Sequence, residues 1–520
     1  MKKYKNITKQ KTSQTDMPFI KPKGKVFSYE DNLESGLEAV KNFYSLYDKF
    51  PKKVKQLAKE IAFISNKDKQ NRIDLTDKLI FTIDGDDSKD FDDAVDIEKT
   101  GSGYKLGVHI ADVAHYIKQG SVLDKEAIKR GTSVYFPNAV YHMLPHELSS
   151  GMCSLKEDEE RLCLSLNMDI DSAGHVKSYK IFESVIRSNA RLTYKNTSKI
   201  IDGDKVLSKM YLPFIESLVQ MNELALILKE KRKKRGAIDF VTYESEFEID
   251  GGNVVGLKRA DRLNSHYIIE EFMILANETI AEHFNKIKAP FVYRNHNKSS
   301  FEKFEKLEMF LHSLGLSHNL DFNNLTSKDI QNFLKNVPEH LLGVVNKVTL
   351  RAMSKAIYEN KNKGHFGLAS EFYCHFTSPI RRYADLMIHR VIKEYLKNNQ
   401  LANFKPIVIH AAKEATNREI LAEAAERKYN DFLKAKYMQD KIGQRFKGII
   451  SSIANFGFFV ELDNTAEGLV RIESLDGHYE YIEEANILKG KEIFKLGQEV
   501  EIEVESAKGD RIDFILVCSL

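Results

Sequence analysis

The sequence has few cysteines and no long apolar run, and each shortage excludes a class of protein. Only four cysteines occur in 520 residues, and no two of them form a CxxC pair: Cys153, Cys163, Cys374 and Cys518. Neither a disulfide framework nor a zinc site is therefore expected, and a cytoplasmic location, where thiols stay reduced, fits best. No run of 18 or more apolar residues is present, and no apolar segment follows the first lysines, so we expect no membrane span and no secretory signal.

A strong excess of charge of one sign is also missing. The formal net charge is +3, which neither requires nor excludes a nucleic-acid partner. Residues 1–26 hold eight lysines and one acid, Asp16, which indicates either a solvated tail or a nonspecific phosphate-binding arm. Hydrophobic residues make up 42% of the chain, enough for a sizeable core, and 520 residues suffice for roughly three domains.

Apolar periodicity predicts an α+β protein, in which a mixed α/β domain is followed by a small all-β barrel. Helices are predicted at 33–62, with an interruption at Pro51, and at 206–235, 266–286 and 406–439. Strands are predicted at 79–83, with 106–110 as its partner, and at 162–168 and 177–185. We divide the chain into a basic extension and linker at 1–50, a large mixed domain at 51–439 and the barrel at 440–520.

The barrel prediction depends on five short strand candidates near the end of the chain. They span 446–450, 457–461, 468–471, 499–505 and 511–517. The run Glu499-Val-Glu-Ile-Glu-Val-Glu alternates strictly between polar and apolar residues, as a half-buried strand does. Five strands in so short a stretch predict a small closed barrel.

Six aspartates lie within the ten residues from Asp84 to Asp93. Carboxylates so close repel one another, so the segment is either a solvated acidic loop or a site for a divalent cation. Apolar strands on both sides and Phe91 inside the cluster argue against a mobile loop. A calcium loop of the EF-hand type is excluded, because the sixth position from Asp84 is Lys89 and the twelfth is Val95. We favour a catalytic Mg²⁺ site for phosphoryl chemistry.

The same segment, Asp84-Gly-Asp-Asp-Ser-Lys-Asp-Phe-Asp-Asp-Ala, resembles the signature of the RNase II/RNase R family of exoribonucleases. Six further motifs follow in the family's order, so the resemblance covers roughly residues 50–520: His109–Tyr116, Arg130–Pro137, Leu148–Leu155, Gly236–Phe240, Glu270-Glu271 and His375–Tyr383. Seven motifs in the correct order make coincidence very improbable, and their residues are more similar to those of RNase R than to those of RNase II.

The resemblance implies an RNB-type catalytic domain that degrades single-stranded RNA from its 3′ end. Hydrolysis is expected to be processive and to release nucleoside 5′-monophosphates. The catalytic acids that the family pattern implies are also the Mg²⁺ ligands, with Mn²⁺ as a substitute: Asp84, Asp90, Asp92 and Asp93. The remaining two aspartates, Asp86 and Asp87, fall outside the matched positions and are expected in solvent.

Arg381, in the last motif, is the expected cation on the reacting phosphate, because a guanidinium grips phosphate oxygens at two points. The alternative for Arg381 is an ion pair with an acid such as Asp385, in which case Arg382 takes the role on RNA. Three histidines of the motifs show no metal-ligand spacing and are expected to be structural: His109, His115 and His375.

Four further residues match family positions that contact RNA. Tyr135 and Phe240 correspond to aromatics that clamp bases, and stacking accepts any base. Tyr194 and Glu270 correspond to positions that hold the terminal nucleotide, where a carboxylate can accept a hydrogen bond from a ribose hydroxyl. Without the motif context, Tyr135 or Phe240 would more often be a core residue. The position of each in a family motif favours the RNA-binding interpretation instead.

The terminal barrel resembles an S1 domain, an OB-fold module that binds RNA. The resemblance lies in Gly443–Ile450, Asn455–Glu461 and Glu467–Glu473. Four residues are expected to stack on bases or contact phosphates: Phe456, Phe459, Lys447 and Arg471. Other phenylalanines must form the core of so small a barrel.

One departure from the family concerns how RNA is guided. Family members usually carry two cold-shock-type barrels before the catalytic domain, and only about fifty residues precede it here. We therefore expect the lysine-rich tail or a separate protein, such as an RNA helicase or another RNA-decay partner, to compensate. The protein is expected to be a monomer. An RNA-binding scaffold with an inactive catalytic core is the main alternative, and a metal-dependent phosphatase or DNA nuclease is another.

Overall fold

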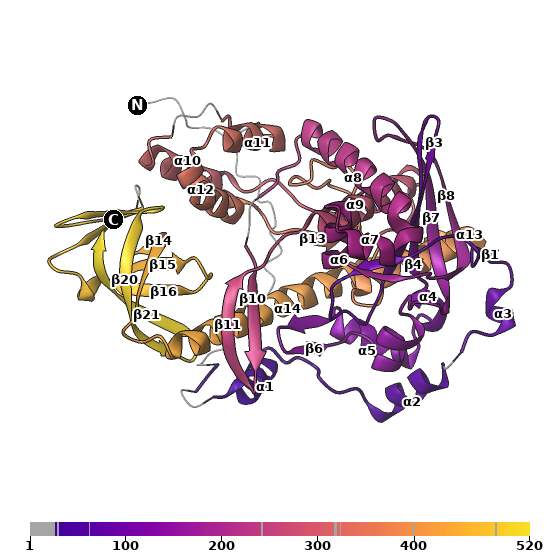
Figure 1. Ribbon diagram of the computed structural model, residues 1–520, viewed down its shortest axis with the longest axis horizontal. Coiled ribbons are helices and arrows are strands. Elements are labelled where there is room, and N and C mark those ends of the chain that lie inside the picture. The colour runs from indigo at the N-terminus through magenta and orange to yellow at the C-terminus, as the bar shows by residue number, and fades with distance from the viewer. Residues whose placement is uncertain are drawn as a thin grey trace.

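The computed structural model describes residues 26–28, 31–61, 63–240, 243–316, 320–322, 324–397, 400–483 and 486–519. The lysine-rich tail predicted at 1–26 lies outside these residues except for Val26. A mixed α/β body occupies most of the molecule, and the barrel stands at one end of it (Figure 1). The α+β class predicted from periodicity is confirmed.

The body is built around a five-stranded sheet. Its strands, in spatial order, are β1 (Ile73–Asp74), β8 (Val176–Arg187), β7 (Glu160–Asp171), β4 (Gly103–Ala111) and β3 (Asp93–Thr100). The expected pairing of 79–83 with 106–110 is wrong. The strand β2 (Thr82–Asp84) pairs instead in parallel with β9 (Arg191–Thr193), and β4 pairs with β3 and β7. The aspartate-rich loop separates β2 from β3, so the strand after the loop takes the place beside β4.

Helices pack on this sheet and connect it to the barrel. They include α8 (Ile215–Arg235), α9 (Asn264–Lys286), α13 (Tyr383–Lys397) and α14 (Lys405–Gln439). The last of these confirms the helix predicted at 406–439, and it runs from the body to the barrel (Figure 1). The helix predicted at 206–235 is divided into α7 (Lys205–Met210), a 3₁₀ turn (Leu212–Phe214) and α8. Pro213 lies in the turn, where its missing N–H prevents a continuous helix.

The remaining elements of the body are short or peripheral. Its helices are α1 (Leu33–Phe43), α2 (Lys52–Glu60), α3 (Asn66–Lys69), α4 (Val113–Tyr116), α5 (Val122–Arg130), α6 (Tyr194–Ile201), α10 (Phe301–Ser313), α11 (Ser327–Lys335) and α12 (Glu339–Ala352). Its strands pair as β5 (Val134–Phe136) with β6 (Ala139–Tyr141), β10 (Ser245–Asp250) with β11 (Asn253–Arg259), and β12 (Tyr293–Asn295) with β13 (Ile357–Glu359). The helix predicted at 33–62 is interrupted earlier than expected, since α1 ends at Phe43 and Pro51 directly precedes α2.

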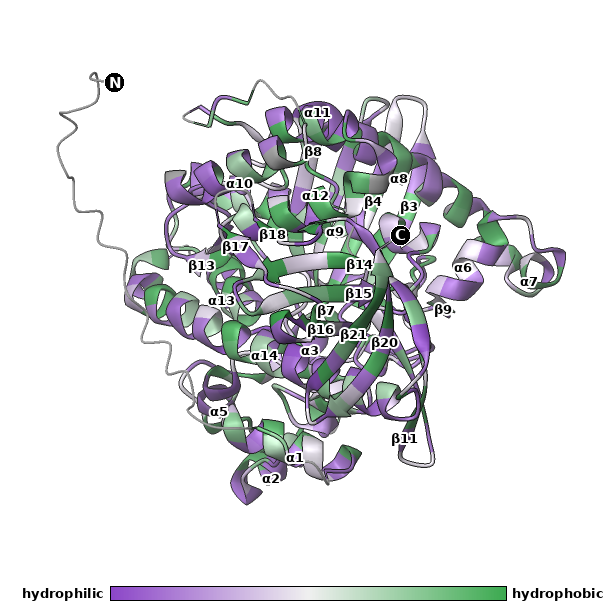
Figure 2. Cartoon of the chain, turned by 90° about the vertical axis from the view of Figure 1, so that its left-hand side faces the viewer, coloured by the Kyte–Doolittle hydropathy of each residue, from purple (hydrophilic) through white to green (hydrophobic). Residues whose placement is uncertain are grey.

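The closed five-stranded barrel predicted near the C-terminus is confirmed. Its strands are β14 (Arg445–Ala454), β15 (Gly457–Leu462), β16 (Glu467–Arg471), β21 (Arg511–Ser519) and β20 (Glu499–Lys508). Apolar and polar bands alternate along β20 (Figure 2), because every second residue faces the barrel core. A three-stranded sheet that was not predicted lies between β16 and β20 in the chain: β17 (Glu480–Ile482), β18 (Ile487–Lys489) and β19 (Ile493–Lys495).

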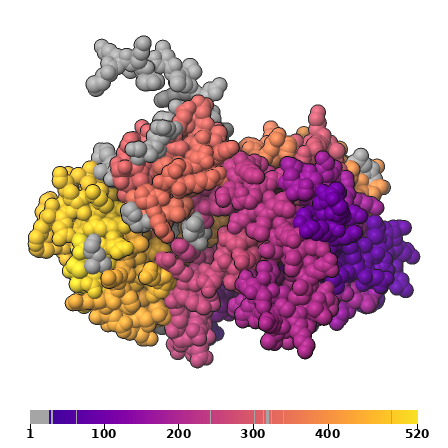
Figure 3. Space-filling view, turned by 45° about the horizontal axis from the view of Figure 1, so that its top comes forward, coloured from indigo at the N-terminus to yellow at the C-terminus, as the bar shows by residue number. Residues whose placement is uncertain are grey.

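The barrel shares a hydrophobic core with the helices α10 to α12. Val344 and Phe304 of these helices belong to the same buried cluster as Phe458 of the barrel. The β10–β11 hairpin, also not predicted, stands between the barrel and the body (Figures 1 and 3). Within the described residues no helix is both long and apolar enough to cross a membrane, and the four cysteines are free.

Candidate active site

The aspartate-rich loop lies between β2, which ends at Asp84, and β3, which begins at Asp93. Phe91, inside the loop, is 6% exposed and packs in the main core. Asp86 and Asp87 are exposed, as expected, and Asp86 pairs with Lys195 at 2.8 Å. The loop is therefore anchored through its apolar residue and turns its two unmatched acids to solvent.

Two residues that the sequence analysis did not single out hold the loop in shape. The Arg191 guanidinium donates hydrogen bonds to the carbonyls of Gly85 (2.9 Å) and Asp86 (2.6 Å). The Ser154 hydroxyl donates to the Lys89 carbonyl and accepts from the Phe91 N–H, both at 3.0 Å. Both side chains bind backbone atoms of the loop. The acidic side chains of the loop therefore gave no indication that Arg191 and Ser154 would contact it.

The four matched aspartates are brought together in an environment that disfavours their charges. Burial, together with the neighbouring Asp93 carboxylate, raises the pKa of Asp84 to about 8. Burial raises the pKa of Asp93 to about 6, although Arg381 opposes the change. Asp92 is 4% exposed, and burial raises its pKa well above the usual range. Asp90 lies in the same electrostatic neighbourhood and contributes to the raised pKa values of Asp84 and Asp92.

These residues fit a hard divalent cation. Asp84 Oδ2 and Asp92 Oδ2 are buried and have no hydrogen-bond partner, so each is a candidate ligand oxygen for a cation. No three acidic, histidine or cysteine side chains among the described residues stand in a ready-made ligand arrangement. Two buried carboxylate oxygens without a hydrogen bond nevertheless favour a cation site, because carboxylates rotate readily on binding and burial of a poorly satisfied carboxylate is costly.

The two arginines of the last motif have different environments. Arg381 is 43% exposed, and its Nε lies 3.5 Å from Asp92 Oδ2. Arg382 is largely buried and donates two hydrogen bonds to Asp385, at 2.9 and 2.7 Å. The ion pair with Asp385 that was the alternative for Arg381 is thus made by Arg382. Arg381 donates one hydrogen bond to the Ser378 hydroxyl at 3.0 Å and otherwise lies partly exposed beside Asp92, whereas the Arg382 guanidinium is engaged by Asp385.

Backbone hydrogen bonds fix the segment that carries Arg381 to two acidic side chains. The Ile380 N–H donates to Asp92 Oδ1 at 2.8 Å, and the Ser378 N–H donates to Asp385 Oδ1 at the same distance. Asp92 therefore has one oxygen fixed by the backbone, while the other makes no hydrogen bond and faces the Arg381 Nε at 3.5 Å. This arrangement sets the separation between the Arg381 guanidinium and the aspartates.

Two of the four RNA-contact candidates border the acidic cluster. The Tyr135 hydroxyl donates to Asp90 Oδ2 at 2.9 Å, and the side chain is 39% exposed. Tyr194 directly follows β9, whose Thr193 pairs with Asp84, and its ring stacks on His266 with centroids 4.1 Å apart. Burial and the charges of Asp93 and Asp84 raise the pKa of Tyr194.

The other two candidates are less close to the acids. Glu270 lies one helical turn beyond His266 on α9 and pairs with Arg262, so it shares the helix face beside Tyr194. Phe240 is half-buried and packs against the core that the barrel shares with α10 to α12.

On the barrel, three of the four predicted contact residues lie together. Phe456 is 47% exposed, and its ring meets Phe459 edge to face at 6.2 Å. Leu469 is the partner of Phe459 across the strands, and Arg471 follows Leu469 by two residues, so all three side chains share the outer face. The Arg471 guanidinium pairs with Asp513 at 3.0 Å. Lys447 is exposed at the other side of the barrel, where it pairs across the strands with Glu501.

The three motif histidines have structural partners. His109 is fully buried between Ser165 (2.8 Å) and Asp96 (2.7 Å). His115 contacts Asp68 at 2.9 Å, and His375 contacts the Tyr358 hydroxyl at 2.8 Å. Each ring is thus engaged by groups that fix its orientation.

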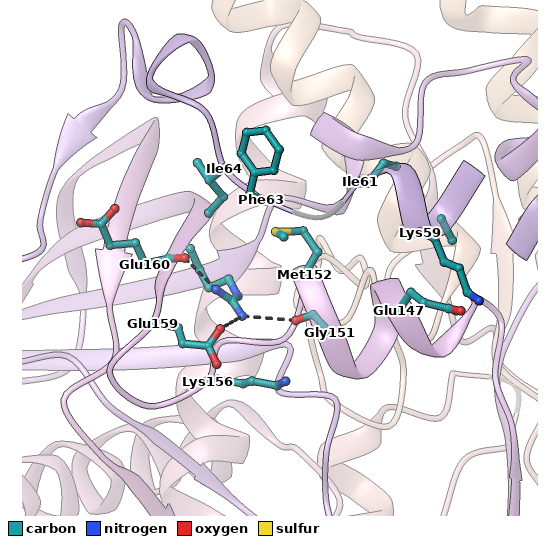
Figure 4. Close-up of a pocket in the computed structure, with 12 residues that line it drawn as sticks. Lys59, Ile61, Phe63, Ile64, Glu147, Gly151, Met152, Lys156, Glu159 and Glu160 are labelled. Carbon is teal, nitrogen blue, oxygen red and sulfur yellow. Dashed lines mark hydrogen bonds and ion pairs between the residues drawn. The ribbon is translucent and has the colours of Figure 1, made fainter. Parts of the chain in front are cut away.

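One surface cavity contains none of the four aspartates in its lining. It has a volume of about 670 Å³ and is lined by Phe63, Ile64 and Met152 with charged residues around them (Figure 4). Arg161 forms part of its wall and donates to the Ser154 carbonyl at 2.8 Å, so the cavity adjoins the outer side of the segment that supports the acidic loop.

Comparison with known proteins agrees with this geometry. The RNB domain family matches residues 72–398, and the S1 RNA binding domain family matches residues 439–516. The chain is 42% identical to Ribonuclease R of Thermotoga maritima over 485 residues, which are 90% of this chain and 68% of that protein. It is 40% identical to Ribonuclease R of Aquifex aeolicus over 513 residues, covering 95% of this chain and 72% of the relative.

Solved structures give the same result. RNase R of Mycoplasma genitalium, in complex with ribose-methylated single-stranded RNA, has a TM-score of 0.87 and 29% sequence identity to this chain. The match covers 94% of this chain and 78% of the Mycoplasma chain. The same protein in complex with double-stranded RNA has a TM-score of 0.83. The predicted succession of an RNB domain and an S1 domain is confirmed. The chain therefore belongs to the RNase II/RNase R family of hydrolytic exoribonucleases, and its relatives are of the ribonuclease R type.

Proposed function

We propose that this protein degrades single-stranded RNA from the 3′ end, processively, and releases nucleoside 5′-monophosphates. The observation that carries the proposal is the meeting of four aspartates with Arg381: two buried carboxylate oxygens make no hydrogen bond, and the partly exposed guanidinium lies 3.5 Å from one of them. Such a site suits a phosphodiester, because it offers a place for a cation and a separate positive group for the phosphate.

The proposed metal is Mg²⁺, with Mn²⁺ as a substitute, held by Asp84, Asp90, Asp92 and Asp93. When bound, it would supply a polarised phosphate oxygen and a water of lowered pKa. Arg381 would grip the non-bridging phosphate oxygens and stabilise the charge that develops on them. The backbone hydrogen bond from Ile380 to Asp92 would keep that guanidinium in register with the carboxylates.

The substrate strand would be held by aromatic and polar side chains on either side of the acids. Tyr135 and Phe240 would clamp bases, and Tyr194 and Glu270 would bind the terminal nucleotide, with Glu270 accepting a hydrogen bond from a ribose hydroxyl. Phe456, Phe459, Lys447 and Arg471 would bind the strand upstream on the barrel. Arg382 is proposed to support this surface through Asp385 and not by direct contact, since its guanidinium is already engaged.

Further expectations also remain proposals. The division into residues 1–50, 51–439 and 440–520 places α1 outside the catalytic domain, although α1 packs on α14. A helicase or other RNA-decay partner, a monomeric state and a cytoplasmic location are compatible with the fold. An inactive RNA-binding scaffold is the second candidate function.

The test uses 5′-labelled single-stranded RNA with Mg²⁺ or with EDTA. We expect stepwise shortening from the 3′ end that stops in EDTA and with Asp92→Asn, together with nucleoside 5′-monophosphates as products. Calorimetry should show Mg²⁺ binding to the wild type that is lost in Asp92→Asn. Binding of RNA without cleavage in Mg²⁺ or Mn²⁺ would favour the scaffold, and equal cleavage of the matching DNA would contradict the role of the ribose hydroxyl.

A further inference from the structure

The base of the β10–β11 hairpin carries a partly exposed aromatic–arginine pair. The Arg259 guanidinium lies over the Tyr243 ring at 4.3 Å from its centroid. Arg259 pairs across the strands with Ser245, two residues after Tyr243, so the three side chains share one face of the hairpin. Tyr243 is 53% exposed, and because Arg259 covers one side of its ring, the rest of the ring is accessible.

Arg259 is incompletely satisfied. Its Nε is buried and has no hydrogen-bond partner. Its acidic neighbour Asp463 lies 3.7 Å from the guanidinium and is fully exposed, so this ion pair is weak. Glu246 faces the other side of the hairpin, where it pairs with Lys258 at 3.3 Å. An oxyanion on the Tyr243 face would give the exposed part of the Arg259 guanidinium a stronger partner than Asp463.

The pair stands where a strand bound to the barrel would pass toward the acids. The hairpin lies between the barrel and the body (Figures 1 and 3). Ser245 contacts Thr465, in the turn between β15 and β16, through their hydroxyls at 2.7 Å. Only seven residues separate Arg259 from His266, the ring stacked on Tyr194, which is at most about 25 Å of chain. A bound strand could therefore touch the barrel, the hairpin and the acidic site in succession.

We propose that Tyr243 and Arg259 form a nucleotide-binding platform on the path of the RNA. A base of the strand stacks on the Tyr243 ring, and an adjacent phosphate accepts hydrogen bonds from the Arg259 guanidinium. The inference rests on the proposed function, because the strand must be drawn past the hairpin to reach the acids. It adds a contact that none of the motif residues supplies.

The test compares RNAs of increasing length. Labelled oligoadenylates of about 4 to about 16 nucleotides are bound, in EDTA, to the full chain carrying Asp92→Asn. Adding Tyr243→Ala or Arg259→Gln should weaken binding of the long RNAs by roughly five- to a hundredfold and leave the shortest RNA unchanged. Tyr243→Phe, which keeps the ring, should bind like its parent, and Arg259→Lys should recover only part of the loss because it keeps charge without a planar fork.

Arg187→Gln is the matched control, since Arg187 is also a half-exposed arginine in an ion pair, with Glu160 at 3.1 Å. It should leave binding unchanged at every length. Unchanged affinity of the platform variants at all lengths would overturn the inference. An equal loss for the shortest RNA would overturn it too, since the contact would then belong to the acidic site. Cleavage by the otherwise wild-type protein is measured separately, so failure of the platform remains distinguishable from failure of the proposed function.

Discussion

The acidic site and the barrel surface are assembled in opposite ways. At the site, charged groups lie inside the protein, where burial raises the pKa values of Asp84 and Asp93, and backbone hydrogen bonds from distant segments hold them. On the barrel, Phe456 and Arg471 project from the surface of a regular sheet. Buried charges at fixed positions suit transition-state stabilisation, whereas exposed rings and charges suit binding that tolerates any sequence. Substitutions at the site should therefore change rate, and those on the barrel should change affinity.

The largest effect is expected from Asp92→Asn. Removal of one carboxylate from the proposed cation site should lower single-turnover cleavage by at least about a hundredfold while leaving RNA affinity nearly unchanged. Asp87→Asn, on the exposed part of the same loop, is the control and should cleave normally. A large rate loss in both variants would show that loop charge in general, and not the buried position, matters.

A second contrast separates the neighbouring arginines. Arg381→Gln should slow cleavage by roughly a hundredfold with unchanged thermal stability, because its guanidinium is partly exposed beside the acids. Arg382→Gln should instead cost about 3–5 kcal/mol of unfolding free energy, since it leaves Asp385 buried without its partner. Denaturant unfolding and cleavage assays of both variants check the assignment, and a stable but inactive Arg382→Gln would reverse it.

A smaller effect, on affinity alone, is expected from the barrel aromatics. The double variant Phe456→Ala with Phe459→Ala should weaken RNA binding by roughly tenfold at unchanged kcat. Phe458→Ala is the structural counterpart, because that ring is fully buried, and it should cost about 3–5 kcal/mol of stability. Deletion of the whole barrel is a less clean test, since it would expose the core shared with α12. Full affinity in the double variant would show that this face of the barrel does not bind the RNA.

The smallest effect is expected from Arg471→Gln. Arg471 is exposed and already paired with Asp513, so its loss should weaken binding by only a few-fold at low salt. The diagnostic measurement is the slope of log affinity against log salt concentration, which should become shallower by about 0.7 if Arg471 contacts one phosphate. An unchanged slope would remove Arg471 from the set of phosphate contacts.

Much of the architecture could be predicted from local patterns. Strict alternation in 499–505 and the high content of Ala, Glu and Lys in 406–439 correspond to β20 and α14, because each signal extends over the whole element. The β17–β19 sheet has strands of three residues, which is too short for a period to emerge. The β10–β11 hairpin could have been predicted from its turn residues, because Gly251-Gly252 separates the two runs that form its strands.

What the sequence determined by itself was the chemistry present: six clustered aspartates around one apolar anchor, an Arg-Arg pair in a family motif, and a terminal alternation that closes into a barrel. Only the tertiary structure decided which groups act together. It paired Arg382 with Asp385 and left Arg381 beside Asp92, and it brought Arg191 to the backbone of the acidic loop across about a hundred residues. The physical reason is that short motifs record the residue types a reaction needs. Burial, unpartnered oxygens and long-range hydrogen bonds arise only when distant segments pack.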